Sequence, residues 1–217
     1  MRSACFILLV IVGIAGEANA NTHSITFGRA LPVKLLIGPS ENKTLDITVR
    51  PLYVDGKLKE FTTGNPHDVT EQEFVVRRAY RINDVLPDDP HKNARWLWER
   101  GNWLVVNRVS GKVMVLNFPD FDPFYSEVSW YRDYAAYCGV TSSNDRVVAV
   151  VVEIAGKKPL FRKTVGQSKG GDTSDSNCLP PRWERQPPRV TFFPVGSDQF
   201  TVNVSGHFAD QAEDSDE

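Results

Sequence analysis

The chain has 217 residues, of which 41% are hydrophobic and 11% aromatic, with 25 basic side chains against 27 acidic ones. Between residues 21 and 208, 24 bases face 21 acids, an excess too small and too mixed to indicate a nucleic-acid partner. A chain of this length can form one domain with a real hydrophobic core, and large all-β domains commonly reach this size.

The first twenty residues are typical of an export signal. Arg2 provides a short basic start, residues 4–14 form an apolar run, and Ala18-Asn19-Ala20 has the small-x-small pattern of a signal peptidase site. The run is too short to span a bilayer, and no later stretch approaches that length. A buried N-terminal helix is the alternative. We therefore expect a periplasmic or extracellular protein that begins near Asn21 and has no membrane span in its mature part.

Removal of this signal leaves two cysteines, Cys138 and Cys178. In an exported chain two cysteines most simply form one disulfide. Closing a loop of 40 positions corresponds to about 4 kcal/mol in the chain-entropy model. A catalytic thiol is the competing interpretation, but no Cys-x-x-Cys motif or adjacent histidine accompanies either residue.

Strand patterns dominate the N-terminal half. Residues 24–37 indicate one or two strands, with Pro32 marking a break or an edge. The alternation of residues 45–53 and the Asp55-Gly56 turn predict a hairpin that returns through residues 58–62. Residues 71–81 fit either a capped helix or a strand, and their β-branched content favours the strand. Proline, Asp and Asn predict a loop over residues 83–93.

The pattern of the second half indicates an antiparallel meander with regularly spaced turns. The expected strands cover residues 103–108, 113–118, 146–154, 159–165, 189–194 and 199–205, and residues 166–182 are expected to form a flexible loop. Residues 103–113 followed by Val128-Ser-Trp-Tyr-Arg-Asp133 resemble one blade of a β-propeller, which carries a strand, a Ser-Gly turn and a Ser-Trp-x-x-Asp corner. The resemblance implies a local meander, because no second copy of the blade occurs in the chain.

The predicted fold is therefore all-β, a mostly antiparallel meander that is blade-like over residues 95–165 and has at most short helices. One β-rich domain is expected over residues 21–208. Residues 209–217 carry five acids and no base, and we expect them to form a disordered, solvated tail.

Residues 120–140 combine seven aromatic side chains, four acids, one arginine and one cysteine. Small residues beside large ones over residues 134–140 suggest a strand buried on both sides. A helix over residues 129–138, ended by Gly139, is the alternative. The principal interpretation is a hydrophobic core, because tyrosine and tryptophan bury large areas while keeping a polar group for a hydrogen bond.

Functional interpretations of the same stretch remain open. The candidate binding residues in it are Asp120, Asp122, Glu127, Trp130, Tyr131, Arg132 and Asp133. The acids in the loop could supply oxygen ligands to calcium, or a catalytic pair as in glycoside hydrolysis. Exposed aromatic side chains could form a sugar- or peptide-binding platform, for which the candidates are Trp96, Trp98, Trp103, Tyr125 and Tyr131.

Other chemistry is not indicated by any motif. The four histidines show no zinc-binding spacing, and no Gly-x-Ser-x-Gly or phosphate-binding loop occurs, so we expect no metal, cofactor or assigned catalytic residue. His67-Asp68 could be a base with its orienting acid, but a polar turn is the simpler interpretation. The leading hypothesis is a non-enzymatic binding or interaction module of the cell envelope or exterior, with a carbohydrate or protein ligand. A carboxylate-dependent hydrolase acting through residues 120–133 is the alternative, and a purely structural domain is the third.

Overall fold

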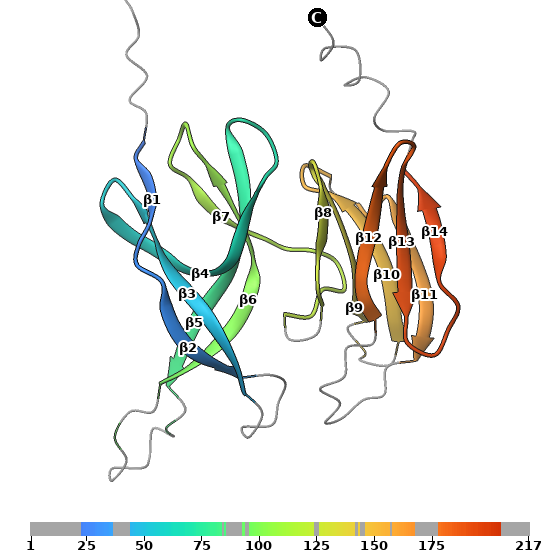
Figure 1. The fold of residues 1–217 in the computed structure, drawn as a ribbon, viewed down its shortest axis with the longest axis horizontal. Helices are drawn as coiled ribbons and strands as arrows, with labels where there is room; N and C mark the ends of the chain where they lie inside the picture. Colours follow the sequence, from blue (N-terminus) through green and yellow to red (C-terminus); the bar gives the residue numbers. More distant parts are fainter. Residues whose placement is uncertain are drawn as a thin grey trace, which may run out of the picture.

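The computed structural model describes residues 23–36, 44–83, 85, 93, 96–123, 126–141, 143, 146–156, 158–167 and 178–204. The described residues form fourteen strands and no helix, which confirms the all-β prediction. The strands make three sheets, one from the N-terminal half and two from the C-terminal half (Figure 1). The predicted export signal, most of the predicted loop at 83–93 and the acidic tail lie outside the described residues.

The N-terminal sheet has seven strands that curl into a ring. They are β1 (Ile25–Phe27), β2 (Leu31–Leu36), β3 (Thr44–Val54), β4 (Lys57–Asp68), β5 (Glu73–Asn83), β6 (Trp96–Asn107) and β7 (Val113–Leu116). The predicted turn at Asp55-Gly56 joins β3 to β4, and both residues have positive φ, as a tight hairpin turn requires. β3 pairs with both β2 and β4, and β2 pairs in parallel with β6 where Leu35 meets Trp98, so the order β2-β3-β4-β5-β6 returns to β2.

The two faces of β5 have different neighbours because side chains alternate along a strand. Phe74 and Val76 point into an apolar cluster that also contains Leu52, Leu104 and Val106. Strands β1 and β7 cover this cluster with Ile25, Phe27 and Val113. The opposite face carries the odd-numbered residues of β5 and their partners in β4 and β6. Part of this face contacts the C-terminal half through His67, Arg77 and Trp103.

The C-terminal half is a sandwich of two antiparallel sheets. The first contains β8 (Ser129–Tyr131), β9 (Tyr134–Val140), β10 (Arg146–Glu153) and β11 (Phe161–Gln167). The second contains β12 (Cys178–Arg185), β13 (Pro188–Pro194) and β14 (Phe200–Asn203). The buried cluster between the sheets includes Tyr134 and Ala136 of β9, Ala149 and Val151 of β10, and Phe192 of β13.

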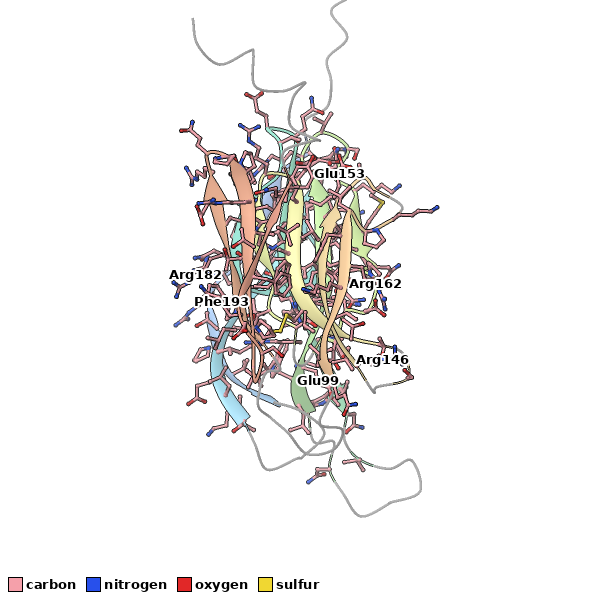
Figure 2. The ribbon with its side chains drawn as sticks, turned by 90° about the vertical axis from the view of Figure 1, so that its right-hand side faces the viewer. Glu99, Arg146, Glu153, Arg162, Arg182 and Phe193 are labelled. Carbon is pink, nitrogen blue, oxygen red and sulfur yellow. A yellow bond between two sulfur atoms is a disulfide. The ribbon has the colours of Figure 1, made fainter. Side chains whose placement is uncertain are left out.

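The predicted disulfide is present and joins the two sheets of the sandwich. Cys138 of β9 is bonded to Cys178 of β12, with 6.1 Å between the Cα atoms (Figure 2). Both cysteines belong to the buried cluster between the sheets. The bond therefore fixes the start of β12 against the central part of the four-stranded sheet.

Three expectations about local structure are settled by the strand assignments. The stretch 129–138 contains β8 and β9, so the strand prediction is confirmed and the alternative helix is wrong. The blade-like region does not form one sheet, because β6 and β7 belong to the N-terminal sheet while β8 and β9 belong to the sandwich. The predicted loop at 166–182 extends too far towards the C-terminus, because β12 begins at Cys178. β12 contains two prolines at the point where its pairing with β13 shifts register.

Candidate functional site

The stretch that the sequence singles out is the junction between the ring and the sandwich. After β7 the chain crosses to β8 through residues 117–128 (Figure 1). Phe118, Phe121 and Trp130 pack on the outer face of the four-stranded sheet, where they cover Tyr137 and Val150. The crossing segment therefore fills the space beside β9 and β10 with aromatic rings.

Tyr137 lies at the centre of this aromatic packing and is 0% exposed. Its ring is stacked on Phe118 and edge-on to Phe121, with centroid distances of 5.6 and 5.4 Å. Its hydroxyl donates a hydrogen bond to the carbonyl oxygen of Pro119 at 2.6 Å. Burial, assisted by the charge of Asp120, raises the pKa of Tyr137 far above its ordinary value. Together with buried Tyr134 on the other face, this confirms a strand buried on both sides.

Trp130 connects the sandwich to the ring. Its indole stacks on the His67 ring at 5.6 Å and meets the Trp103 indole edge-on at 5.0 Å. His67 Nε2 donates a hydrogen bond to the carbonyl oxygen of Arg132 at 2.8 Å, while Asp68 pairs with Arg108. His67 and Asp68 thus have different partners and do not form a base with its orienting acid.

Arg77 is the charged centre of the junction and is only 6% exposed. Its guanidinium carbon lies 4.8 Å from the Phe121 centroid and 5.7 Å from the Trp103 centroid, and Nη2 donates to the carbonyl oxygen of Pro123 at 2.7 Å. Burial lowers the pKa of Arg77 to about 10, with the nearby Glu127 acting in the opposite direction. The side chain therefore stays charged at neutral pH and holds the crossing segment against β5.

The acids of the stretch are directed to different partners. Asp120 pairs with Arg162 of β11 at 2.7 Å, and Glu127 pairs with Arg100 of β6 at 2.5 Å. The main chain of Asp122 is held by Ser126, whose amide donates to the Asp122 carbonyl at 2.8 Å. Among the described residues, no three His, Cys, Asp or Glu side chains are grouped so that they could hold a metal ion. The calcium hypothesis therefore has no support in this loop.

The remaining candidates of the stretch shape the β8–β9 corner. Arg132 has a φ of 52°, and the carbonyl oxygen of Asp133 accepts a hydrogen bond from the Ile154 amide at 2.9 Å. Tyr131 is stacked on Trp183 of β12 at 5.5 Å, and the guanidinium carbon of Arg132 lies 5.7 Å from the Tyr131 centroid. These contacts join β8 to the second sheet of the sandwich.

An open cavity of about 290 Å³ lies beside the start of the crossing segment. One wall is formed by residues 115–119 and the other by the end of β10 and the turn into β11, including Glu153 and Lys158. It is smaller than most pockets that enclose a small molecule, which are roughly 300–1,000 Å³.

The exposed aromatic surface lies elsewhere, on the same face of the ring but farther along β5 and β6. Trp96 is 52% exposed and Trp98 is half-buried. The guanidinium carbon of Arg81 lies 5.0 Å from the Trp96 centroid and 5.6 Å from the Trp98 centroid. Phe61 of β4 supports Trp98 edge-on at 5.2 Å. We call Trp96, Arg81, Trp98 and Phe61 the tryptophan–arginine ladder.

The ladder follows from strand register. Arg81 is directly opposite Trp98 in the β5–β6 pairing, and Asn83 is opposite Trp96, so the three long side chains share one face. Sequence reasoning identified the two indoles and missed Arg81 and Phe61, because only the register reveals that they are neighbours.

The other candidates for an aromatic platform are placed differently. Trp103 lies on the same face as the ladder but is covered by the junction, where it meets Trp130. Tyr131 is covered by Trp183. Tyr125 lies outside the described residues.

No protein-family model, no curated protein sequence and no solved structure matches this chain. Within the described residues, no helix is long and apolar enough to cross a membrane.

Proposed function

We propose that the protein is an exported, non-enzymatic binding module of the cell envelope or exterior, and that its ligand is a saccharide chain that lies on the tryptophan–arginine ladder. The observation that carries this proposal is the 52% exposure of Trp96 beside half-buried Trp98. Large exposed aromatic side chains at a surface are a common mark of a binding site.

The contrast with the junction supports this choice of site. Phe118, Phe121, Trp130 and Tyr137 pack against one another in the junction. Trp96 is far more exposed, with 52% of its surface accessible. A flat ring suits the apolar face of a sugar, whose hydroxyl groups at the rim stay in water. An apolar peptide anchor would instead favour a closed pocket.

The hydrolase alternative has less support. Catalysis of glycoside hydrolysis uses two carboxyl groups that face the same bond across roughly 5–10 Å. Asp120 and Glu127 instead form ion pairs with Arg162 on the sandwich and Arg100 on the ring. Their partners direct the two carboxylates towards different sheets, which favours a binding role over a catalytic one.

The test is a binding screen with the mature protein against oligosaccharides and peptides, followed by affinity measurement for any hit. Trp96→Ala should weaken saccharide binding at least about tenfold, the effect of losing one stacked aromatic contact. Leu179→Ala is the matched control, since Leu179 is an exposed apolar side chain of the sandwich at 58%. Equal affinity of wild type and Trp96→Ala for the saccharide, or hits among peptides alone, would contradict the proposal.

A further inference from the structure

We infer that the ladder selects an acidic saccharide, with the guanidinium of Arg81 binding the carboxylate of a uronic acid unit. This inference rests on the proposed function and adds the chemical class of the ligand. It is carried by the position of Arg81 beside two indoles and by the way the neighbouring charges are paired.

Arg81 is exposed and lies beside both indoles of the ladder. The guanidinium carbon lies over the Trp96 and Trp98 rings, at 5.0 and 5.6 Å from their centroids, and the side chain is exposed. Its N–H groups lie in the plane of the fork, the geometry that binds a carboxylate through two parallel hydrogen bonds. The indoles also limit the motion of this long side chain, which lowers the entropy lost when a ligand binds.

The other arginines of β5 and β6 that flank the ladder already have partners. Arg78 pairs with Glu60 at 2.9 Å, Arg100 pairs with Glu127 at 2.5 Å, and Arg77 is buried in the junction. In the described part of the chain, no carboxylate pairs with Arg81, although its side chain is exposed. An exposed cation held beside aromatic rings, with no counter-charge from these strands, is complementary to an anionic ligand.

The saccharide carboxylate fits this surface better than an acidic peptide does. A uronic acid unit carries its carboxylate on the sugar ring itself, so one unit can stack on Trp96 and place its charge at Arg81. A flexible acidic side chain would meet the cation without using the indole. Both features of the ladder are then used by one ligand unit, and both should contribute to affinity.

The experiment compares oligogalacturonate with its fully methyl-esterified form, because the ester keeps the sugar chain and removes the charge. Poly-glutamate of similar length tests charge without sugar. The wild-type protein should bind the acid at least about tenfold more tightly than the ester, and poly-glutamate more weakly than the acid. Arg81→Gln should remove the preference for the acid, whereas Trp96→Ala should weaken binding of acid and ester alike.

Arg182→Gln is the matched control variant. Arg182 is also an exposed arginine over an aromatic ring, 5.3 Å from the Phe193 centroid, on one flank of the sandwich (Figure 2). Its replacement should leave all affinities unchanged.

The outcomes separate this inference from the proposed function. Equal binding of acid and ester, or an unchanged preference in Arg81→Gln, would overturn the acidic specificity while the saccharide site stands. Binding of poly-glutamate as tight as that of the acid would overturn the saccharide as the ligand class. If neither sugar binds, or if Trp96→Ala binds both as wild type does, the proposed function itself fails.

Discussion

Replacing Tyr137 by phenylalanine removes a single hydroxyl from the centre of the junction and keeps the ring. That hydroxyl donates to the carbonyl oxygen of Pro119 at 2.6 Å, and the residue is 0% exposed. The ring contacts with Phe118 and Phe121 remain, so no cavity the size of a side chain is created. We expect the free energy of unfolding at neutral pH to fall by about 1 kcal/mol, the net value of one buried hydrogen bond.

The same substitution should have the opposite effect in alkaline solution. Burial raises the pKa of Tyr137 far above the value in an unfolded chain, so the folded protein keeps a proton that the unfolded chain releases above about pH 10. The unfolded state then binds fewer protons than the folded state, and this tyrosine lowers the free energy of unfolding by about 1.4 kcal/mol for each further pH unit. Phenylalanine carries no such proton, so the two stability curves should cross at about pH 11.

Urea unfolding of the disulfide-bonded protein, followed by tryptophan fluorescence in steps from about pH 8 to about pH 11.5, measures both curves. Burial also raises the pKa values of Tyr80 and Tyr134 to about 12, but these groups are present in both proteins and cancel in the difference. A difference between wild type and Tyr137→Phe that stays constant over this range would refute the reasoning.

Three further changes test the sandwich and the crossing segment. Replacing both Cys138 and Cys178 by alanine should lower the free energy of unfolding by about 3–4 kcal/mol, because the disulfide closes a loop with a sequence separation of 40. A urea titration measures this loss, and a value below about 1 kcal/mol would contradict the chain-entropy argument. Gly139→Ala should prevent stable folding, because the added Cβ would lie 1.8 Å from the carbonyl oxygen of Asp120. Circular dichroism and expression yield measure the effect, and a variant as stable as wild type would show that this close approach is not required. Arg162→Gln should cost less than about 1 kcal/mol by thermal unfolding, since its pair with Asp120 is partly exposed; a larger loss would give this ion pair a structural role.

Local signals in the sequence were sufficient for most strands and for the disulfide. The Asp55-Gly56 turn marks the β3–β4 hairpin because few other residues tolerate the positive φ values found there. The alternation of small and large residues over 134–140 indicated a strand covered on both faces, and β9 is buried on both. In each case the relevant interaction is between residues close in the sequence or is fixed by their chemistry.

The division of the meander between two sheets and the tryptophan–arginine ladder depend on interactions between residues far apart in the sequence, which no local pattern contains. β7 and β8 belong to different sheets because residues 117–128 cross between them with aromatic side chains that pack on β9 and β10. Arg81 meets Trp98 only because a register shift between Arg77 and Ala79 sets which residues of β5 and β6 face each other. A shift of one position would turn either side chain to the opposite face of the sheet.

One face of β5 and β6 is covered over part of its length and exposed over the rest. Near the crossing segment it is covered: Arg77 and Trp103 pack against Phe121 and Trp130, and this contact joins the ring to the sandwich. Farther along the same strands the cover ends, and Arg81 stands with its indole neighbours at the surface. A structural role alone would explain the covered half, because enclosed contacts between a guanidinium and aromatic rings hold the two halves together. It does not explain an exposed indole beside an arginine that pairs with no carboxylate of the described strands, and a ligand that stacks on the ring and carries a carboxylate would account for both.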